Sequence, residues 1–248
     1  MNPLRRFRLS RDRSVTVANL VDELLRRNGD CEVGIEDGVP WGLAQLHAEV
    51  HSIDAFLRSR AGLCPGQAVA IYRSNDRRYF RWFLAIIRAG GIAVPLNPML
   101  SLAEVRRILT DSGTEILVTD RAVFERSIGE RGALPVRTWI QEDDEAEHMN
   151  GFLRFAGNGE PYETYSPVTI DSAATVAVFH TSGTSGFPKG AALSSTALLG
   201  ARLCGARGAG AGAEGPGAYC AAVVAHHGRQ YCSLWADGRD SRLLHGSF

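Results

Sequence analysis

Residues 181–190 read TSGTSGFPKG and directly follow a short apolar run, residues 175–179, that is typical of a buried strand. The glycines can take positive φ angles, and successive backbone N–H groups of such a loop can turn toward an anion. The hydroxyl groups add hydrogen-bond donors, and Lys189 supplies a mobile cation. The stretch therefore predicts a loop that can bind a polyphosphate.

Seven residues of this stretch are the candidate phosphate ligands, and Lys189 among them is also the catalytic candidate. They are Thr181, Ser182, Gly183, Thr184, Ser185, Gly186 and Lys189. The loop is not a Walker A motif, because the GxxxxGK[ST] spacing is absent and Lys189 follows a proline. The alternative interpretation is a Ser/Thr/Gly turn that only joins two strands. The dense run of small and hydroxyl residues before Pro-Lys-Gly favours the phosphate role.

Strands and helices alternate upstream of the loop. Short apolar runs after Gly or Pro predict buried strands at residues 68–72 and 92–96, and a further strand is predicted at residues 116–119. Between them lie a helical stripe at residues 80–87 and a helix that begins with a capping box at Ser101 and Glu104. This alternation predicts an α/β fold with a parallel sheet flanked by helices, in which ligands bind beyond the carboxyl ends of the strands.

The remaining segments are predicted from periodicity and polarity. Two amphipathic helices precede the first strand, and Thr16 is expected to cap the first of them while Asn28-Gly29 ends it. Residues 141–167 are acidic, polar and irregular, so we expect a long surface connection there.

Composition limits the partners and the compartment. The formal net charge is zero, so no overall field steers the chain to nucleic acid or to an anionic membrane. No apolar run is long enough to cross a membrane, and no apolar core follows the arginines near the N-terminus as a signal peptide would require. The five cysteines form no CxxC pair, which argues against a zinc site and a disulfide framework. We expect a cytoplasmic protein without a bound structural metal and leave its oligomeric state open.

The motif at residues 181–190 resembles the signature of the adenylate-forming superfamily, which includes acyl-CoA synthetases, peptide-synthetase adenylation domains and luciferases. Residues 85–120, AIIRAGGIAVPLNPMLSLAEVRRILTDSGTEILVTD, resemble an early block of that family, and Asn75 also matches. His180 stands where relatives often have an aromatic residue, and Ser195 stands where many have histidine.

The resemblance implies the N-terminal part of the adenylate-forming fold and a reaction in two steps. A carboxylate attacks the α-phosphate of ATP to give an acyl-adenylate and pyrophosphate, and coenzyme A then displaces AMP. ATP, Mg²⁺ and coenzyme A are the implied cofactors, and Lys189 would neutralise developing phosphate charge. Residues 85–120 look nearer to fatty-acid enzymes than to amino-acid enzymes, so we expect a fatty acid as the small carboxylate substrate and a place in fatty-acid metabolism. Aryl acids remain open.

The resemblance covers only the front part of the family. We expect residues 1–204 to form the N-terminal portion of the adenylation domain, with the C-terminal lid domain absent. Residues 205–248 read as an aberrant tail, because codons for residues 206–248 read one base later can encode an LPLxHxxG segment like the family's next block. The tail is therefore predicted to be frameshifted. The alternative function is a catalytically inactive fragment, at most a weak nucleotide-binding or interaction module.

Overall fold

The computed structural model describes most of the first 199 residues of the chain. The described residues are 14–36, 39–74, 76–142, 149–155, 157, 165–182 and 188–199. Asn75 and the predicted tail at residues 205–248 lie outside them, so the domain boundaries stay predictions. Within the described part, no helix is both long and apolar enough to cross a lipid bilayer.

A seven-stranded sheet forms the centre of the molecule, in the order β7-β6-β5-β3-β4-β8-β9. Every neighbouring pair is parallel except β8 and β9, which form an antiparallel hairpin. The strands are β3 (Ala68–Ile71), β4 (Ile92–Pro95), β5 (Ile116–Thr119), β6 (Thr138–Gln141), β7 (Leu153–Arg154), β8 (Thr175–Ser182) and β9 (Pro188–Ser194). The predicted mostly parallel sheet is confirmed, and the four predicted strands correspond to β3, β4, β5 and β8.

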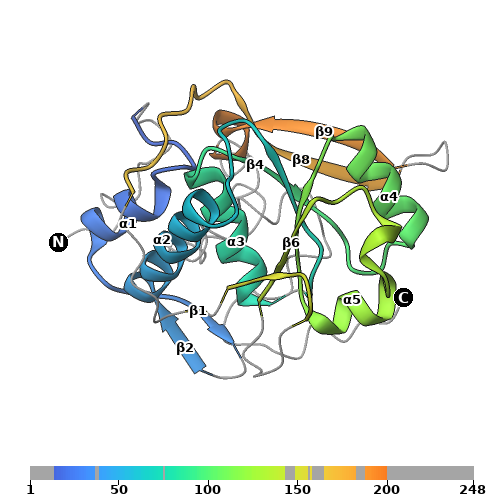
Figure 1. Cartoon of the computed structure of the whole chain (residues 1–248). Helices are drawn as coiled ribbons and strands as arrows, with labels where there is room; N and C mark the ends of the chain where they lie inside the picture. Colours follow the sequence, from blue (N-terminus) through green and yellow to red (C-terminus); the bar gives the residue numbers. More distant parts are fainter. Residues whose placement is uncertain are drawn as a thin grey trace.

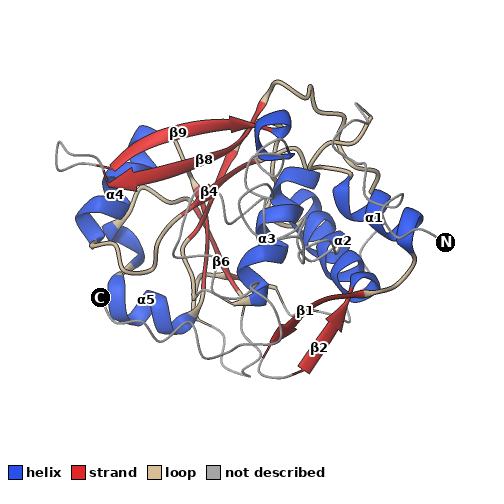
Figure 2. Ribbon diagram, turned by 180° about the vertical axis from the view of Figure 1, so that it is seen from behind, coloured by secondary structure: helices blue, strands red, loops and turns tan. Residues whose placement is uncertain are grey.

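Helices cover both faces of the sheet, as Figures 1 and 2 show from opposite sides. One group comprises α1 (Leu20–Asn28), α2 (Leu43–Ser59) and α3 (Arg77–Arg88), and the other comprises α4 (Leu102–Asp111) and α5 (Arg121–Ser127). Alternate strand residues enter two cores: Val69 and Ile71 pack with α1 to α3, whereas Ala70 packs with α4 and α5. Both faces of each central strand are thus buried, which explains their continuous apolar sequences.

A two-stranded antiparallel sheet, which the sequence pattern did not predict, is formed by the segment that connects α1 to α2 along the chain. It consists of β1 (Glu32–Glu36) and β2 (Val39–Gly42). Trp41 on β2 is buried, and the guanidinium of Arg77 lies 5.7 Å from the centre of its ring. The hairpin therefore joins the helical layer through this side chain.

The helix ends agree with the sequence signals except at the start of α1. Gly29 ends α1 with a φ of 69°, and its N–H donates to the carbonyl of Leu25. The expected cap by Thr16 is wrong, because α1 begins only at Leu20 with Asn19 as its N-cap. The Asn19 side chain instead accepts a hydrogen bond from the Thr16 backbone at 2.8 Å, so residues 16–19 form a turn ahead of the helix.

Residues 141–167 are only partly the surface connection that was expected. Gln141 closes β6, and β7 adds an edge strand to the sheet. Phe155 is buried, with its ring centre 5.3 Å from that of Phe56 and 5.4 Å from that of Trp82. The acidic residues on either side obscured the short apolar segment that packs here.

Glu142 is the buried centre of an ion-pair network. Its carboxylate accepts hydrogen bonds from the guanidinium groups of Arg73 and Arg81 and from the indole of Trp82. Arg81 also pairs with buried Glu49 at 3.2 Å. These contacts join the residues that follow β3 and β6 to α2 and α3, so one carboxylate compensates two buried cations.

We expect Glu142→Gln to lower the free energy of unfolding by about 3 kcal/mol or more, because it removes the buried carboxylate that two buried guanidinium groups share. Arg73 would keep its ion pair with Asp76, and Arg81 would keep its ion pair with Glu49. Urea unfolding of the two proteins would measure the difference. The matched control is Glu125→Gln, which breaks the pair with Arg121 at a side chain that is 61% exposed and should cost no more than about 1 kcal/mol. Equal costs for the two variants would contradict the assigned importance of the buried network.

The capping box at the start of α4 gives a second stability prediction. The Glu104 carboxylate accepts from the backbone N–H of Ser101 at 2.8 Å, and Ser101 Oγ accepts from the Glu104 N–H at 3.4 Å. Ser101→Ala should therefore lower the free energy of unfolding by about 1 kcal/mol.

The difference in free energy of unfolding between the unaltered chain and Ser101→Ala should be smaller in acid. Hydrogen bonds from Ser101 lower the pKa of Glu104, so the ionised carboxylate stabilises the folded state above its unfolded pKa and loses this effect as the pH falls through its folded pKa. Chemical unfolding at neutral pH and near pH 3 would measure both values. A difference that grows in acid would contradict the prediction.

Candidate functional site

The predicted phosphate loop joins β8 to β9. The antiparallel register pairs Thr181 with Lys189 and Ser182 with Pro188. Thr181 and Ser182 therefore belong to β8 and Lys189 to β9, so the loop itself is shorter than the predicted stretch of ten residues. The hairpin brings the two ends of the motif together.

The centre of the motif lies outside the described residues. This applies to four of the predicted phosphate ligands, Gly183, Thr184, Ser185 and Gly186. The structure thus assigns strand positions to Thr181, Ser182 and Lys189, of which Lys189 is exposed. The role of all seven residues stays a prediction.

The loop end of the β8–β9 hairpin lies beyond the carboxyl ends of the parallel strands, where ligands were expected. β8 runs parallel to β4, with Ala177 opposite Ala93, so its carboxyl end points the same way as those of the central strands. β8 continues to Ser182, whereas β4 ends at Pro95. Both views show the hairpin reaching beyond the central strands toward α4 (Figures 1 and 2). The end of the hairpin is therefore placed beyond the carboxyl ends of the parallel strands.

His180 lies near the loop end of the hairpin, opposite Gly190. Its Nδ1 atom is buried and has no hydrogen-bond partner among the described residues. Burial lowers the pKa of His180, an effect that the charge of Asp111 partly opposes. The neutral imidazole is therefore the form favoured at pH 7.

Gly190 has a steric reason for being glycine. A Cβ atom at this position would lie 3.1 Å from His180 Nε2 and 3.2 Å from Val178 Cγ1 on the paired strand. Both distances are tighter than ordinary van der Waals contact. The last glycine of the motif thus lets β9 pair closely with β8 beside the His180 ring.

Ser195 anchors the chain just after β9. It is buried, and its Oγ accepts a hydrogen bond from the backbone N–H of Val17 at 2.9 Å. Val17 is itself buried, in the segment that precedes α1. Serine at this position, where many proteins of the resembled family have histidine, therefore makes a contact that joins two distant parts of the chain.

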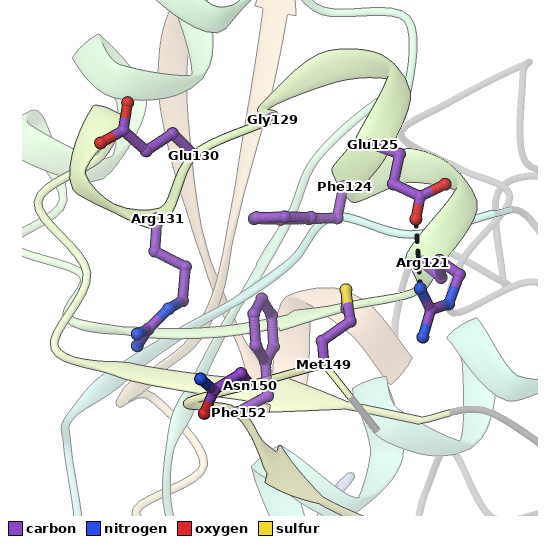
Figure 3. A pocket seen from close by; sticks show the side chains of 9 residues that line it. All are labelled: Arg121, Phe124, Glu125, Gly129, Glu130, Arg131, Met149, Asn150 and Phe152. Carbon is purple, nitrogen blue, oxygen red and sulfur yellow. Dashed lines mark hydrogen bonds and ion pairs between the residues drawn. The ribbon is translucent and has the colours of Figure 1, made fainter. Parts of the chain in front are cut away.

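An open pocket of about 690 Å³ lies near β7, the outermost strand opposite the hairpin (Figure 3). Its lining combines aromatic, sulfur-containing and charged side chains from α5, the turn η3 (Arg131–Ala133) and the segment before β7. The lining residues are Arg121, Phe124, Glu125, Gly129, Glu130, Arg131, Met149, Asn150 and Phe152. It contains none of the predicted site residues, because β7 and β9 are the two opposite edges of the sheet.

Comparison with known proteins gives a match over most of the chain. The family described as AMP-binding enzyme matches residues 22–236. The chain is 31% identical over 163 residues to a fatty acid–[acyl-carrier-protein] ligase, ScoC, of Streptomyces coeruleorubidus, covering 64% of this chain and 29% of that protein. It is 32% identical over 137 residues to the nonribosomal peptide synthetase ecdA of Aspergillus rugulosus, covering 55% of this chain and 2% of that protein.

Solved structures share the fold at low sequence identity. The anthranilate CoA ligase AuaEII in complex with anthranoyl-AMP superposes with a TM-score of 0.64 at 18% identity, covering 82% of this chain and 38% of that one. A putative long-chain-fatty-acid CoA ligase from Rhodopseudomonas palustris CGA009 gives 0.64 at 22% identity, covering 78% and 48%. The chain thus spans less than half the length of these proteins and has the fold of their matching portion.

Proposed function

The chain belongs to the AMP-binding enzyme family, and we propose that it functions as an AMP-forming ligase that activates a carboxylic acid. In the first step a carboxylate oxygen attacks the α-phosphorus of ATP, and the bond to the leaving pyrophosphate breaks. In the second step the thiolate of coenzyme A attacks the acyl carbon and expels AMP. The observation that carries the proposal is the TSGTSGFPKG motif on a hairpin beyond the carboxyl edge of a parallel sheet.

Lys189 is the residue proposed to contact the phosphates. The chain contains 27 lysine and arginine residues, of which 26 are arginine and Lys189 is the single lysine. Arginine presents a planar fork, whereas lysine presents a compact ammonium group on a flexible stem. A chain that uses arginine elsewhere and lysine at this position supports a specific need for an ammonium group there. Its exposure at the hairpin leaves it accessible to a nucleotide.

The remaining parts of the proposed site are hydrogen-bond donors. Thr181 and Ser182, with the loop residues Gly183 to Gly186, would supply hydroxyl and backbone N–H groups to phosphate oxygens. Mg²⁺ would neutralise charge on the phosphates when bound with ATP, and we assign none of the described residues as its ligand. Positioning and charge neutralisation are the chemistry that this segment offers.

A fatty acid is the proposed substrate. The sequence relative ScoC is a fatty acid ligase by name, and one of the structural neighbours is a putative long-chain-fatty-acid CoA ligase. The anthranilate CoA ligase among the neighbours makes aryl acids the comparison to include. Residues 85–120, which build α4, β4 and β5, also look like those of fatty-acid enzymes.

Carboxylate-dependent exchange between ATP and pyrophosphate tests turnover by the purified chain. With fatty acids we expect exchange that Lys189→Ala reduces by about 100-fold or more, because a cation at developing phosphate charge is lost. The control is Arg137→Ala, which removes a side chain that is 72% exposed. Arg137 directly precedes β6, at the amino ends of the parallel strands, so its loss should leave exchange unchanged. Exchange with aryl acids alone would contradict the proposed substrate class.

Nucleotide binding can be tested separately, since Lys189 is the single lysine. Pyridoxal 5′-phosphate followed by borohydride should label the chain at Lys189 and at the N-terminal amine, as peptide mass spectrometry would show. ATP should protect Lys189 and leave the N-terminal amine reactive, which serves as the internal control. Protection without exchange would support the second candidate, a nucleotide-binding segment without turnover, for which the 29% coverage of ScoC is the motivation. Labelling of Lys189 that ATP does not slow would contradict both candidates.

A further inference from the structure

α1 and α2 bring one carboxylate and two imidazole rings together. Asp22 Oδ1 on α1 lies 3.0 Å from His47 Nε2 and 2.7 Å from His51 Nε2, both on α2. The ligand atoms of the three residues all lie within 4.8 Å of one another. Two histidines four positions apart occupy the same face of a helix, which is why both rings reach the same oxygen. None of these residues belongs to the hairpin or to the pocket of Figure 3.

The arrangement has the composition and spacing of a metal site. Imidazole nitrogens and a carboxylate oxygen are ligands that zinc accepts, and three protein ligands leave a fourth position for water. Two ligand atoms on a tetrahedral zinc ion lie about 3.3 Å apart. The two distances from Asp22 Oδ1 to the imidazole nitrogens therefore need to lengthen by only a few tenths of an ångström. The side chains of Asp22, His47 and His51 are 30%, 28% and 18% exposed, so an ion can reach them from solvent.

Arg88 on α3 holds the carboxylate in the orientation that a metal ligand needs. Its Nη1 donates to Asp22 Oδ2 at 2.5 Å, which leaves Oδ1 directed at the two rings. The Arg88 side chain is only 3% exposed and also pairs with buried Asp54 at 3.1 Å. A hydrogen bond to the second oxygen of a ligating carboxylate is a usual feature of metal sites in proteins.

Arg88 also constrains the tautomer of His51. Its Nη2 lies 3.4 Å from His51 Nδ1 and donates to the carbonyl of Tyr165 at 2.8 Å. A metal on Nε2 requires the proton of neutral His51 to sit on Nδ1, so the long contact to Arg88 would be given up. Arg88 retains Asp22, Asp54 and Tyr165 as partners, and its position therefore allows metal binding.

We propose that Asp22, His47 and His51 form a binding site for a zinc-class divalent metal ion that fastens α1 to α2. The ion would replace the two hydrogen bonds that now join the helices and would add a ligand bond from each residue. The proposal is independent of nucleotide binding, because it shares no residue with the hairpin. The competing interpretation is a metal-free clasp in which the two rings only donate to the carboxylate.

Titration of the untagged, chelator-treated chain with Co²⁺ and then Zn²⁺ distinguishes these interpretations. We expect a visible Co²⁺ absorption band that saturates at one ion per chain and is abolished by Zn²⁺. Zn²⁺ at about 100 times its dissociation constant should raise the melting temperature by roughly 5 °C or more.

Variants assign the binding to this cluster. His47→Gln and His51→Gln keep a hydrogen-bond donor and helix propensity but remove a ligand, so each should weaken binding by about tenfold or more. The matched control is a variant with both His226→Gln and His227→Gln. It removes two consecutive histidines that are not part of the proposed site and should leave the Co²⁺ absorption band unchanged. Absence of saturable binding by the unaltered chain, or equal binding by all variants, would overturn the proposal in favour of the metal-free clasp.

Discussion

The burial of both faces of the parallel sheet is the constraint on which the rest of the structure depends. A strand in such a sheet exposes no side to water, so successive side chains must satisfy two different hydrophobic cores. β3 does so by alternating Val69 and Ile71 toward α1 to α3 with Ala70 toward α4 and α5. The parallel direction then brings the carboxyl ends of all central strands to one edge. β8 inherits its direction from its pairing with β4, and this pairing places the motif-bearing hairpin at that edge.

Charge in the interior follows a different rule from charge at the hairpin. Buried arginines are held by carboxylates through several bonds at once, as Glu142 holds Arg73 and Arg81 and as Asp22 and Asp54 hold Arg88. The guanidinium fork suits this use because it offers several donors in fixed directions. Burial lowers the pKa values of Arg81 and Arg88, which shows the cost that the carboxylates offset. The phosphate contact proposed for Lys189 would instead need a mobile cation, and mobility is the property that separates lysine from the arginines.

Four of the seven strands, β3, β4, β5 and β8, could be predicted from sequence because they are short apolar runs, and β3 and β4 also follow glycine or proline closely. β5 was predicted with both ends correct, and the capping box at Ser101 correctly marked the start of α4. β7 was missed because it lies in the acidic, irregular segment at residues 141–167, and β6 was missed because it ends where that segment begins. β9 was missed because its first three residues, 188–190, were assigned to the loop. The phosphate motif was recognisable from residue types alone, but its pairing within a hairpin depends on contacts between strands. The single lysine and the spacing of His47 and His51 were sequence signals that could have been used, although the position of Asp22 beside them required the tertiary structure.

The two ends of the described chain are coupled through one buried hydrogen bond. Ser195 Oγ, just after β9, accepts from the backbone of Val17, just before α1. Leaving that buried N–H without a partner would cost about 1–3 kcal/mol, so the base of the hairpin and the first helix stabilise each other. α1 is in turn joined to α2 by the Asp22 cluster and to α3 by Arg88. A metal ion at Asp22, His47 and His51 would therefore act on the helical layer that packs against the hairpin, and it would share no residue with the phosphate contact proposed for Lys189.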